Sequence, residues 1–128
     1  MRLLLDTCTF LWLILDAEEL TDHVKQLYSD PDNDVFLSVV SGWEIAVKHA
    51  IGRLDLPEEP RLYIPQQRER HGILSLPLDE AASLQVSTLP AVHNDPFDRM
   101  LVSQALIHGL TILSPDDLIK KYPVQIIW

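Results

Sequence analysis

Residues 3–5 (Leu-Leu-Leu) and 35–37 (Val-Phe-Leu) are short apolar runs without polar residues at alternate positions. A strand with one face in water alternates apolar and polar residues, whereas a strand of a parallel sheet is covered on both faces and does not. Further strands are predicted at 73–74, at 111–113 and, as an edge strand, at 124–128. The pattern therefore predicts a mainly parallel sheet covered by helices.

Helical segments separate these predicted strands. We expect helices over 9–15, 22–29 (capped by Thr21), 41–51 (capped by Ser41), 61–70, 79–90 (capped by Asp79), 94–109 (capped by Asn94 or Asp95) and a short one from 114. Strands that alternate with helices are typical of an α/β fold. The sequence thus predicts a three-layer α/β/α sandwich with a mainly parallel central sheet.

Length and composition narrow the class of protein. The 128 residues suit one domain over 1–128, and 47% apolar with 23% charged residues excludes a disordered tail. A net charge of −9 argues against a basic nucleic-acid coat or a membrane-surface protein. The single cysteine fits a reducing compartment, and the apolar run 10–15 is too short to cross a bilayer. We expect a cytoplasmic domain.

Five acidic residues fall where such a fold would gather them. Asp6 directly follows the first strand, and Asp116 comes just after the strand 111–113. Glu44 is expected in the first turn of the helix after the second strand, and Asp95 and Asp98 begin the helix 94–109. Open α/β sheets bind ligands outside the carboxyl ends of their strands. These carboxylates are therefore expected along one edge of the sheet.

Packed carboxylates repel one another unless a cation joins them. Oxygen ligands suit Mg²⁺ or Mn²⁺ rather than Zn²⁺, and such an ion activates water and bridges phosphate oxygens. The pattern thus indicates metal-assisted hydrolysis of a phosphodiester.

Each acid also has a simpler explanation. Asp6 could be a turn residue, and Glu44 could simply pair with Lys48 four residues on. Asp95 is a good helix cap, and Asp98 would then favour the positive end of that helix. Ser114 and Asp117 resemble a capping box, which would leave Asp116 as a first-turn acid. These simpler explanations do not require all the acids to lie at one edge of the sheet. A shared edge would therefore favour a metal site.

Four segments carry a resemblance to a known family. They are Leu4-Leu5-Asp6-Thr7 followed by Phe10-Leu11-Trp12, then Ser38 to Ile45 (SVVSGWEI), His93 to Leu101 (HNDPFDRML) and Leu113 to Asp116 (LSPD). In their order and spacing the sequence resembles the PIN-domain family, and within it the VapC-type toxins of bacterial toxin–antitoxin pairs. The stretch from His93 to Arg99 is the most specific.

The resemblance implies a Mg²⁺- or Mn²⁺-dependent endoribonuclease that hydrolyses RNA with water activated by the metal. It also implies a homodimer, a cognate antitoxin that covers the acidic cleft, and no membrane partner. The matching catalytic and metal-binding residues are Asp6, Glu44, Asp98 and Asp116, with Asp95 as a ligand or only a cap, and Thr7 and Ser114 as hydroxyl groups beside the acids. Position 8 departs from the pattern, since Cys8 stands where this subgroup often has histidine.

Several neighbouring side chains have two interpretations. We expect Arg99 to pair with nearby carboxylates rather than to read a base, Cys8 to be a small buried side chain, and His93 to be a turn residue rather than a catalyst. Trp43 is expected in the core or in an apolar groove for a partner. An inactive PIN-like module that binds RNA or protein stays open as the alternative function.

Overall fold

All five strands run parallel in one sheet of order β3-β2-β1-β4-β5 in the computed structural model, which describes residues 1–128. The predicted parallel sheet is therefore confirmed, and β3 lies slightly later than the expected 73–74. The strands are β1 (Arg2–Leu5), β2 (Asp34–Ser38), β3 (Leu74–Leu76), β4 (Thr111–Leu113) and β5 (Ile126–Ile127).

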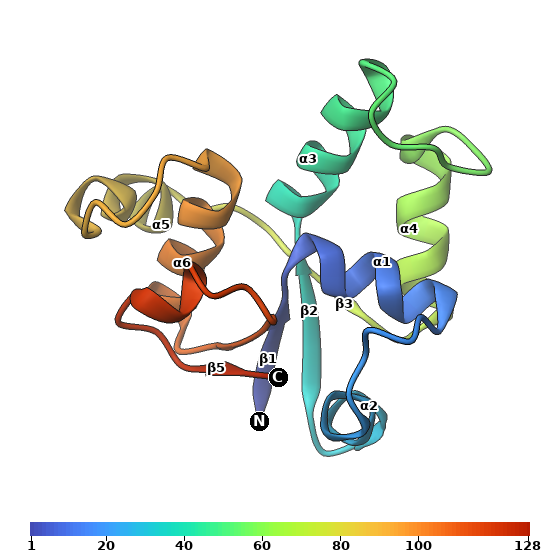
Figure 1. The fold of residues 1–128 in the computed structure, drawn as a ribbon, viewed down its shortest axis with the longest axis horizontal. Coiled ribbons are helices and arrows are strands. Elements are labelled where there is room, and N and C mark those ends of the chain that lie inside the picture. The colour runs from blue at the N-terminus through green and yellow to red at the C-terminus, as the bar shows by residue number, and fades with distance from the viewer.

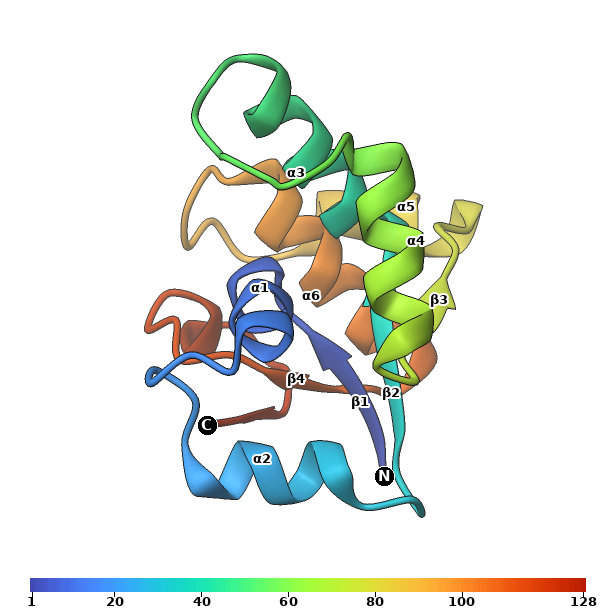
Figure 2. The same cartoon turned by 90° about the vertical axis from the view of Figure 1, so that its right-hand side faces the viewer.

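Helices cover both faces of this sheet, as Figures 1 and 2 show. The α5 and α6 helices lie on one side, and α1, α2 and α4 lie on the other. The three-layer α/β/α sandwich is thus confirmed. The helices are α1 (Thr7–Leu15), α2 (Asp22–Ser29), α3 (Val39–Ala50), α4 (Pro60–Arg70), α5 (Glu80–Gln85) and α6 (Pro96–His108), with 3₁₀ turns η1 (Val86–Thr88) and η2 (Ile119–Lys121).

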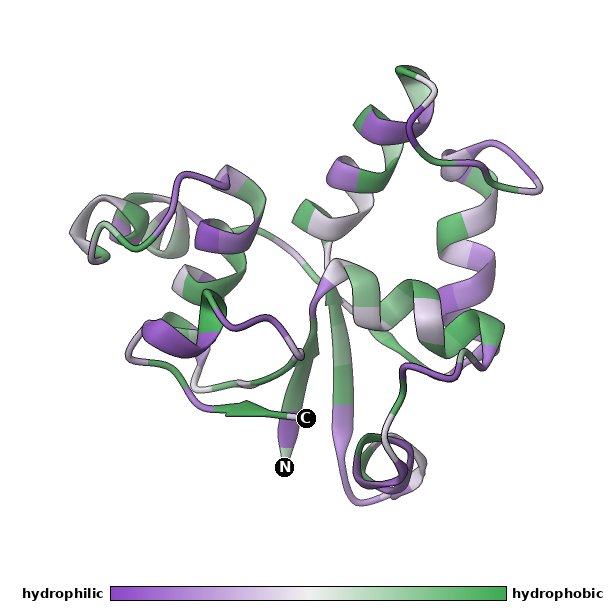
Figure 3. Cartoon of the chain, in the orientation of Figure 1, coloured by the Kyte–Doolittle hydropathy of each residue, from purple (hydrophilic) through white to green (hydrophobic).

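Two hydrophobic cores account for these layers. Leu3 and Leu5 of β1 point into one core, with Phe10 of α1, whereas Leu4 points into the other, with Leu101 of α6. All five side chains are fully buried. Successive residues of a strand point to opposite faces, so an uninterrupted apolar run is what a doubly covered strand requires. Figure 3 shows this as mainly hydrophobic colour along β1 and β2.

The start of α3 differs from the prediction. Ser38 ends β2 and also caps α3 by accepting a hydrogen bond from the Val40 amide, so no loop separates the two elements. Ser41 is therefore not the cap but a fully buried residue inside α3. In the same way α1 begins at Thr7, directly after β1, with Asp6 as its cap.

The start and end of α6 agree with the prediction. Asp95 accepts hydrogen bonds from the amides of Phe97 and Asp98, and Pro96 occupies the first helical position. Gly109 ends the helix in the left-handed conformation, at φ 65°. None of the helices combines the length and the apolar character of a membrane-spanning segment.

Candidate active site

Asp6 stands at the junction of β1 and α1, at the carboxyl edge of the sheet. Its Oδ1 accepts a hydrogen bond of 2.7 Å from the amide of Thr9, and the residue is only 6% exposed. Burial raises the pKa of Asp6, although hydrogen bonds from Ser114 and Thr9 oppose that shift, and the negative charge of Asp116 adds to it. Because the charge of Asp116 affects the pKa of Asp6, the residues after β1 and β4 lie close to each other at this edge of the sheet.

Glu44 reaches the same edge from α3. It lies in the second turn of that helix rather than the first, because α3 starts directly at the end of β2. Thr7 donates to its Oε1 (2.6 Å), and the ammonium of Lys48 lies 2.5 Å from its Oε2. The expected pair between Glu44 and Lys48 is therefore present, and both carboxylate oxygens already have partners.

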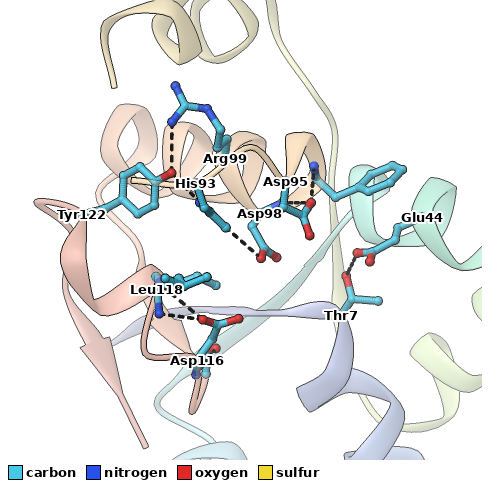
Figure 4. A network of polar contacts seen from close by, with 12 residues as sticks. Thr7, Glu44, His93, Asp95, Asp98, Arg99, Asp116, Leu118 and Tyr122 are labelled. Carbon is cyan, nitrogen blue, oxygen red and sulfur yellow. Dashed lines mark hydrogen bonds and ion pairs between the residues drawn. The ribbon is translucent and has the colours of Figure 1, made fainter. Parts of the chain in front are cut away.

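Asp98 comes from the first turn of α6. Its pKa rises to about 6, first because the side chain is buried and then because Asp95, Asp116 and Glu44 place negative charge around it, while a hydrogen bond from His93 opposes the shift. In Figure 4 the carboxylates of Asp98, Asp116 and Glu44 point toward a common space from three different segments. The pKa of Asp98 is thus raised by the negative charges of three other acids of the site.

Asp116 lies in the loop after β4. Its Oδ1 accepts from the amides of Leu118 and Ile119 ahead of η2, and its own amide donates to the Ser114 hydroxyl. The capping box that Ser114 and Asp117 could form is not present, because Asp116 accepts the hydrogen bonds from the amides of this turn. Ser114 is fully buried beneath this loop.

Arg99 does not pair with a carboxylate, contrary to the prediction. Its guanidinium donates to the carbonyls of Pro90 and Val86 and to the hydroxyl of Tyr122. The reason is helical geometry, because adjacent residues of a helix point in different directions and Arg99 cannot face where Asp98 faces. Arg99 braces the loop before α6 instead.

Two groups near the acids make contacts that the sequence does not predict. His93 lies in the loop before α6, in agreement with the prediction of a turn residue; its Nε2 lies 3.2 Å from Oδ2 of Asp98 and its Nδ1 lies 2.7 Å from the hydroxyl of Tyr122. Tyr122 is only 3% exposed and reaches this place from the C-terminal segment. No local sequence pattern predicts the contact between His93 and Tyr122, which are 29 positions apart.

Two further expectations have different outcomes. Cys8 is exposed rather than buried, because Phe10 and Leu13 occupy the inward face of α1. Its pKa is raised, first by lost hydration and then by the charges of Asp6 and Glu44, so the unreactive thiol form is favoured. Trp43 packs edge-on against Phe97, at 5.0 Å between ring centroids, and remains 60% exposed beside an apolar groove.

The carboxylate oxygens of these acids are the ligands that a hard divalent cation prefers, although they do not lie close enough together to coordinate one ion as they stand. One carboxylate oxygen each of Asp95, Asp98 and Asp116 accepts the hydrogen bonds described above, which leaves the other free. An all-oxygen set of mutually repelling acids matches Mg²⁺ or Mn²⁺. No three or more His, Cys, Asp or Glu residues are grouped closely enough to hold a metal ion as they stand. A cation would have to draw these acids together.

A fully parallel α/β sandwich with buried acids at the carboxyl edge of its sheet defines the class of this protein. The PIN domain family model matches residues 3–125, and the chain belongs to the PIN domain family. A curated relative, Ribonuclease VapC16 of Mycobacterium tuberculosis (strain ATCC 25618 / H37Rv), is 32% identical over 65 residues, which are 51% of this chain. The match spans 46% of that relative's length, just under half.

Solved structures share the fold over nearly the whole chain. VapBC2 from Rickettsia felis, bound to a DNA fragment from its promoter, contains a chain with a TM-score of 0.74 and 12% identity, covering 99% of this chain and 98% of that one. VapBC-1 from nontypeable Haemophilus influenzae has a TM-score of 0.65 and 16% identity, covering 99% of this chain and 97% of that one. FitAcB from Neisseria gonorrhoeae has a TM-score of 0.59 and 18% identity, covering 98% of this chain and 96% of that one. The expected resemblance to VapC-type proteins is confirmed.

Proposed function

We propose that this chain is a Mg²⁺- or Mn²⁺-dependent endoribonuclease and the toxin component of a type II toxin–antitoxin pair. The observation that carries the proposal is the environment of Asp98. Its carboxyl group, with a pKa of about 6, is surrounded by acids from α3, from its own helix cap and from the loop after β4. Such mutual repulsion is retained at a cost to folding, and a bound cation would relieve it.

The proposed roles divide the acids between direct and indirect contact with the cation. Asp6 and Asp98 would hold the principal cation directly. Glu44 would bind through water or hold a second ion, because Thr7 and Lys48 occupy both of its oxygens. Asp116 would share that role, with Asp95 as a further ligand or only the cap of α6.

When bound, the cation would supply the activation of water and the neutralisation of charge on the RNA phosphate. The chain's own side chains would do the rest. Thr7 and Ser114 would fix the positions of the acids beside them. The ammonium of Lys48, whose side chain is 46% exposed, would offer a positive charge to an incoming phosphate at the rim of an otherwise acidic site. Cys8 would not act as a nucleophile, since its pKa is raised.

The proposed protein partner is a cognate antitoxin. Support comes from the solved VapBC structures of the same fold and from a groove of about 400 Å³ between α3 and α4. Trp43 and Val39 are exposed at this groove, and Ile64 lines it with the arginines Arg61 and Arg68. We propose that an apolar segment of the antitoxin lies in this groove and extends over the acids. A homodimer, as the family resemblance implies, is part of the same proposal.

Cleavage of RNA by the purified chain tests the function. We expect cleavage with Mn²⁺ or Mg²⁺, no cleavage in EDTA, and none by Asp98→Asn in either condition. Asp79→Asn is the matched control, because Asp79, like Asp98, contacts a histidine, but it caps α5 outside the acidic site and its loss should leave cleavage unchanged. Cleavage that persists in EDTA, or that is equal in wild type and Asp98→Asn, would contradict the proposal. RNA binding without cleavage would favour an inactive PIN-like binding module.

A further inference from the structure

A chain of hydrogen bonds leads from Arg99 through the buried side chain of Tyr122 to the carboxylate of Asp98. Arg99 Nη1 lies 3.0 Å from the Tyr122 hydroxyl, which lies 2.7 Å from His93 Nδ1. The other ring nitrogen of His93, Nε2, lies 3.2 Å from Oδ2 of Asp98. Figure 4 shows these groups in a row on one side of the acids.

The donor and acceptor roles in this row follow when His93 is a neutral imidazole and Asp98 is an ionised carboxylate. A guanidinium only donates, so the Tyr122 oxygen accepts from Arg99 and its own hydrogen is available for His93 Nδ1. A neutral imidazole that accepts at Nδ1 carries its hydrogen on Nε2, and an ionised carboxylate only accepts. Arg99 therefore donates to Tyr122, Tyr122 donates to His93, and the Nε2–H of His93 donates to Asp98.

The row is anchored at the end away from Asp98. Tyr122 is buried in the hydrophobic core beside α6, and its ring packs at 5.5 Å from that of His93. Arg99 is tied to the carbonyls of Pro90 and Val86 as well as to Tyr122. The side chains of His93 and Asp98 are only 13% and 19% exposed. Packing thus holds the imidazole in place independently of its contact with Asp98.

We propose that Tyr122 and His93 are positioning residues, which fix the imidazole as the Nε2–H tautomer and turn the Asp98 carboxylate so that its free Oδ1 faces a divalent cation. This inference rests on the function proposed above and deepens it. Groups that hydrogen-bond a metal ligand from behind fix its orientation, and their loss typically weakens metal binding or activity by about 10- to 100-fold. Neither His93 nor Tyr122 would touch the cation.

Binding of Mn²⁺ alone, measured by titration calorimetry at pH 7.5, tests the proposal without RNA. We expect His93→Ala to bind Mn²⁺ about 10- to 100-fold more weakly than wild type. Tyr122→Phe, which keeps the packed ring and removes only the hydroxyl, should weaken binding by a smaller factor. His93→Gln, whose amide N–H takes the place of Nε2–H, should recover much of the affinity.

The chain contains a matched control. His108 Nε2 lies 2.6 Å from Oδ2 of Asp79 at the opposite end of α6, a second histidine–aspartate pair outside the acidic site. His108→Ala should leave Mn²⁺ affinity within about twofold of wild type. Melting of each variant in EDTA shows whether it is folded, and Tyr122→Phe keeps the test available if His93→Ala does not fold.

Two further readouts separate positioning from general stability. Adding Tyr122→Phe to His93→Ala should cause no further loss of affinity, because both act through the same N–H. Nitrogen NMR of the metal-free wild type should show the Nε2–H tautomer for His93, and a mixture of tautomers in Tyr122→Phe. Wild-type affinity in His93→Ala, or an Nδ1–H tautomer in wild type, would overturn this inference and leave the proposed nuclease intact. A wild type that binds no Mn²⁺ would overturn both.

Discussion

The hydroxyl of Thr7 donates a hydrogen bond of 2.6 Å to Oε1 of Glu44, a residue 37 positions further along the chain. This contact joins the first turn of α1 to the second turn of α3 at the carboxyl edge of the sheet. Thr7 is also 3.0 Å from the hydroxyl of Ser41, so one side chain ties two positions of α3 to the end of β1. Glu44 is only 5% exposed, which makes this partner important for its charge.

Thr7→Val should therefore destabilise the protein. Valine keeps the shape but leaves Glu44 with Lys48 as its remaining partner, and loss of one hydrogen bond to a buried charge costs about 1.5–3 kcal/mol. Urea unfolding measures the change. Thr88→Val, at an exposed position, is the control and should stay within about 0.5 kcal/mol of wild type. Equal midpoints for Thr7→Val and wild type would show that the contact contributes nothing.

In the metal-free protein, Asp98 should lower the free energy of unfolding as pH rises from about 4 to about 6. Burial, followed by the charge of Asp95, raises the pKa of Asp98 to about 6, above its unfolded value, so the folded state holds a proton that the unfolded state has already released in this window. Asp98 contributes a loss of about 2–3 kcal/mol, at ~1.4 kcal/mol per pKa unit. The raised pKa of Asp6 acts in the same direction. Unfolding in EDTA at a series of pH values measures this slope, which should be shallower in Asp98→Asn.

Asp98→Asn should reverse its effect on stability when metal is added. In EDTA at pH 7 the variant should be more stable than wild type, by about 1–3 kcal/mol, because the amide removes a repelled charge. In millimolar Mn²⁺ the wild type should gain more, since only its carboxylate binds the ion well. Thermal melting under both conditions gives the comparison. A variant that is less stable in both would contradict the account of Asp98.

Ser38→Ala should be costly because this hydroxyl has two functions. It caps α3 by accepting from Val40, and it donates to Oε1 of buried Gln104, at 2.5 Å. Loss of the cap costs about 1 kcal/mol and an unsatisfied buried amide about 1–3 kcal/mol. We expect a total of about 2–4 kcal/mol by chemical unfolding. Ser87→Ala, at an exposed hydroxyl of η1, is the control and should be nearly neutral.

The sheet could be predicted because its signal is local. An uninterrupted apolar run such as residues 3–5 is a direct consequence of burial on both faces of β1. The start of α3 could not be placed, because Ser38 serves as both the last residue of a strand and a helix cap. If a loop is assumed between the strand and the helix, the cap is placed at Ser41 instead of Ser38. Glu44 is then placed in the first turn of the helix instead of the second.

The places of the acids in the fold could be predicted, but not the contacts of their neighbours. Asp6 and Asp116 follow strands, and strand ends share an edge in any parallel sheet. The partners of Arg99 could not be deduced from its neighbour Asp98, since they depend on the direction of the side chain from α6. Tyr122 enters the site from the C-terminal segment through packing of η2 against α6, which has no signature in the sequence.

The most direct measurement is an anomalous difference map from crystals of the wild-type protein soaked in Mn²⁺. The account predicts a peak at the carboxyl edge of the sheet, bounded by the carboxylates of Asp6 and Asp98 and reached by Glu44 and Asp116. The same soak of Asp98→Asn should give a much weaker peak. A wild-type map without density among these side chains, or with its main peak elsewhere on the protein, would contradict the claim that the acids form a cation site.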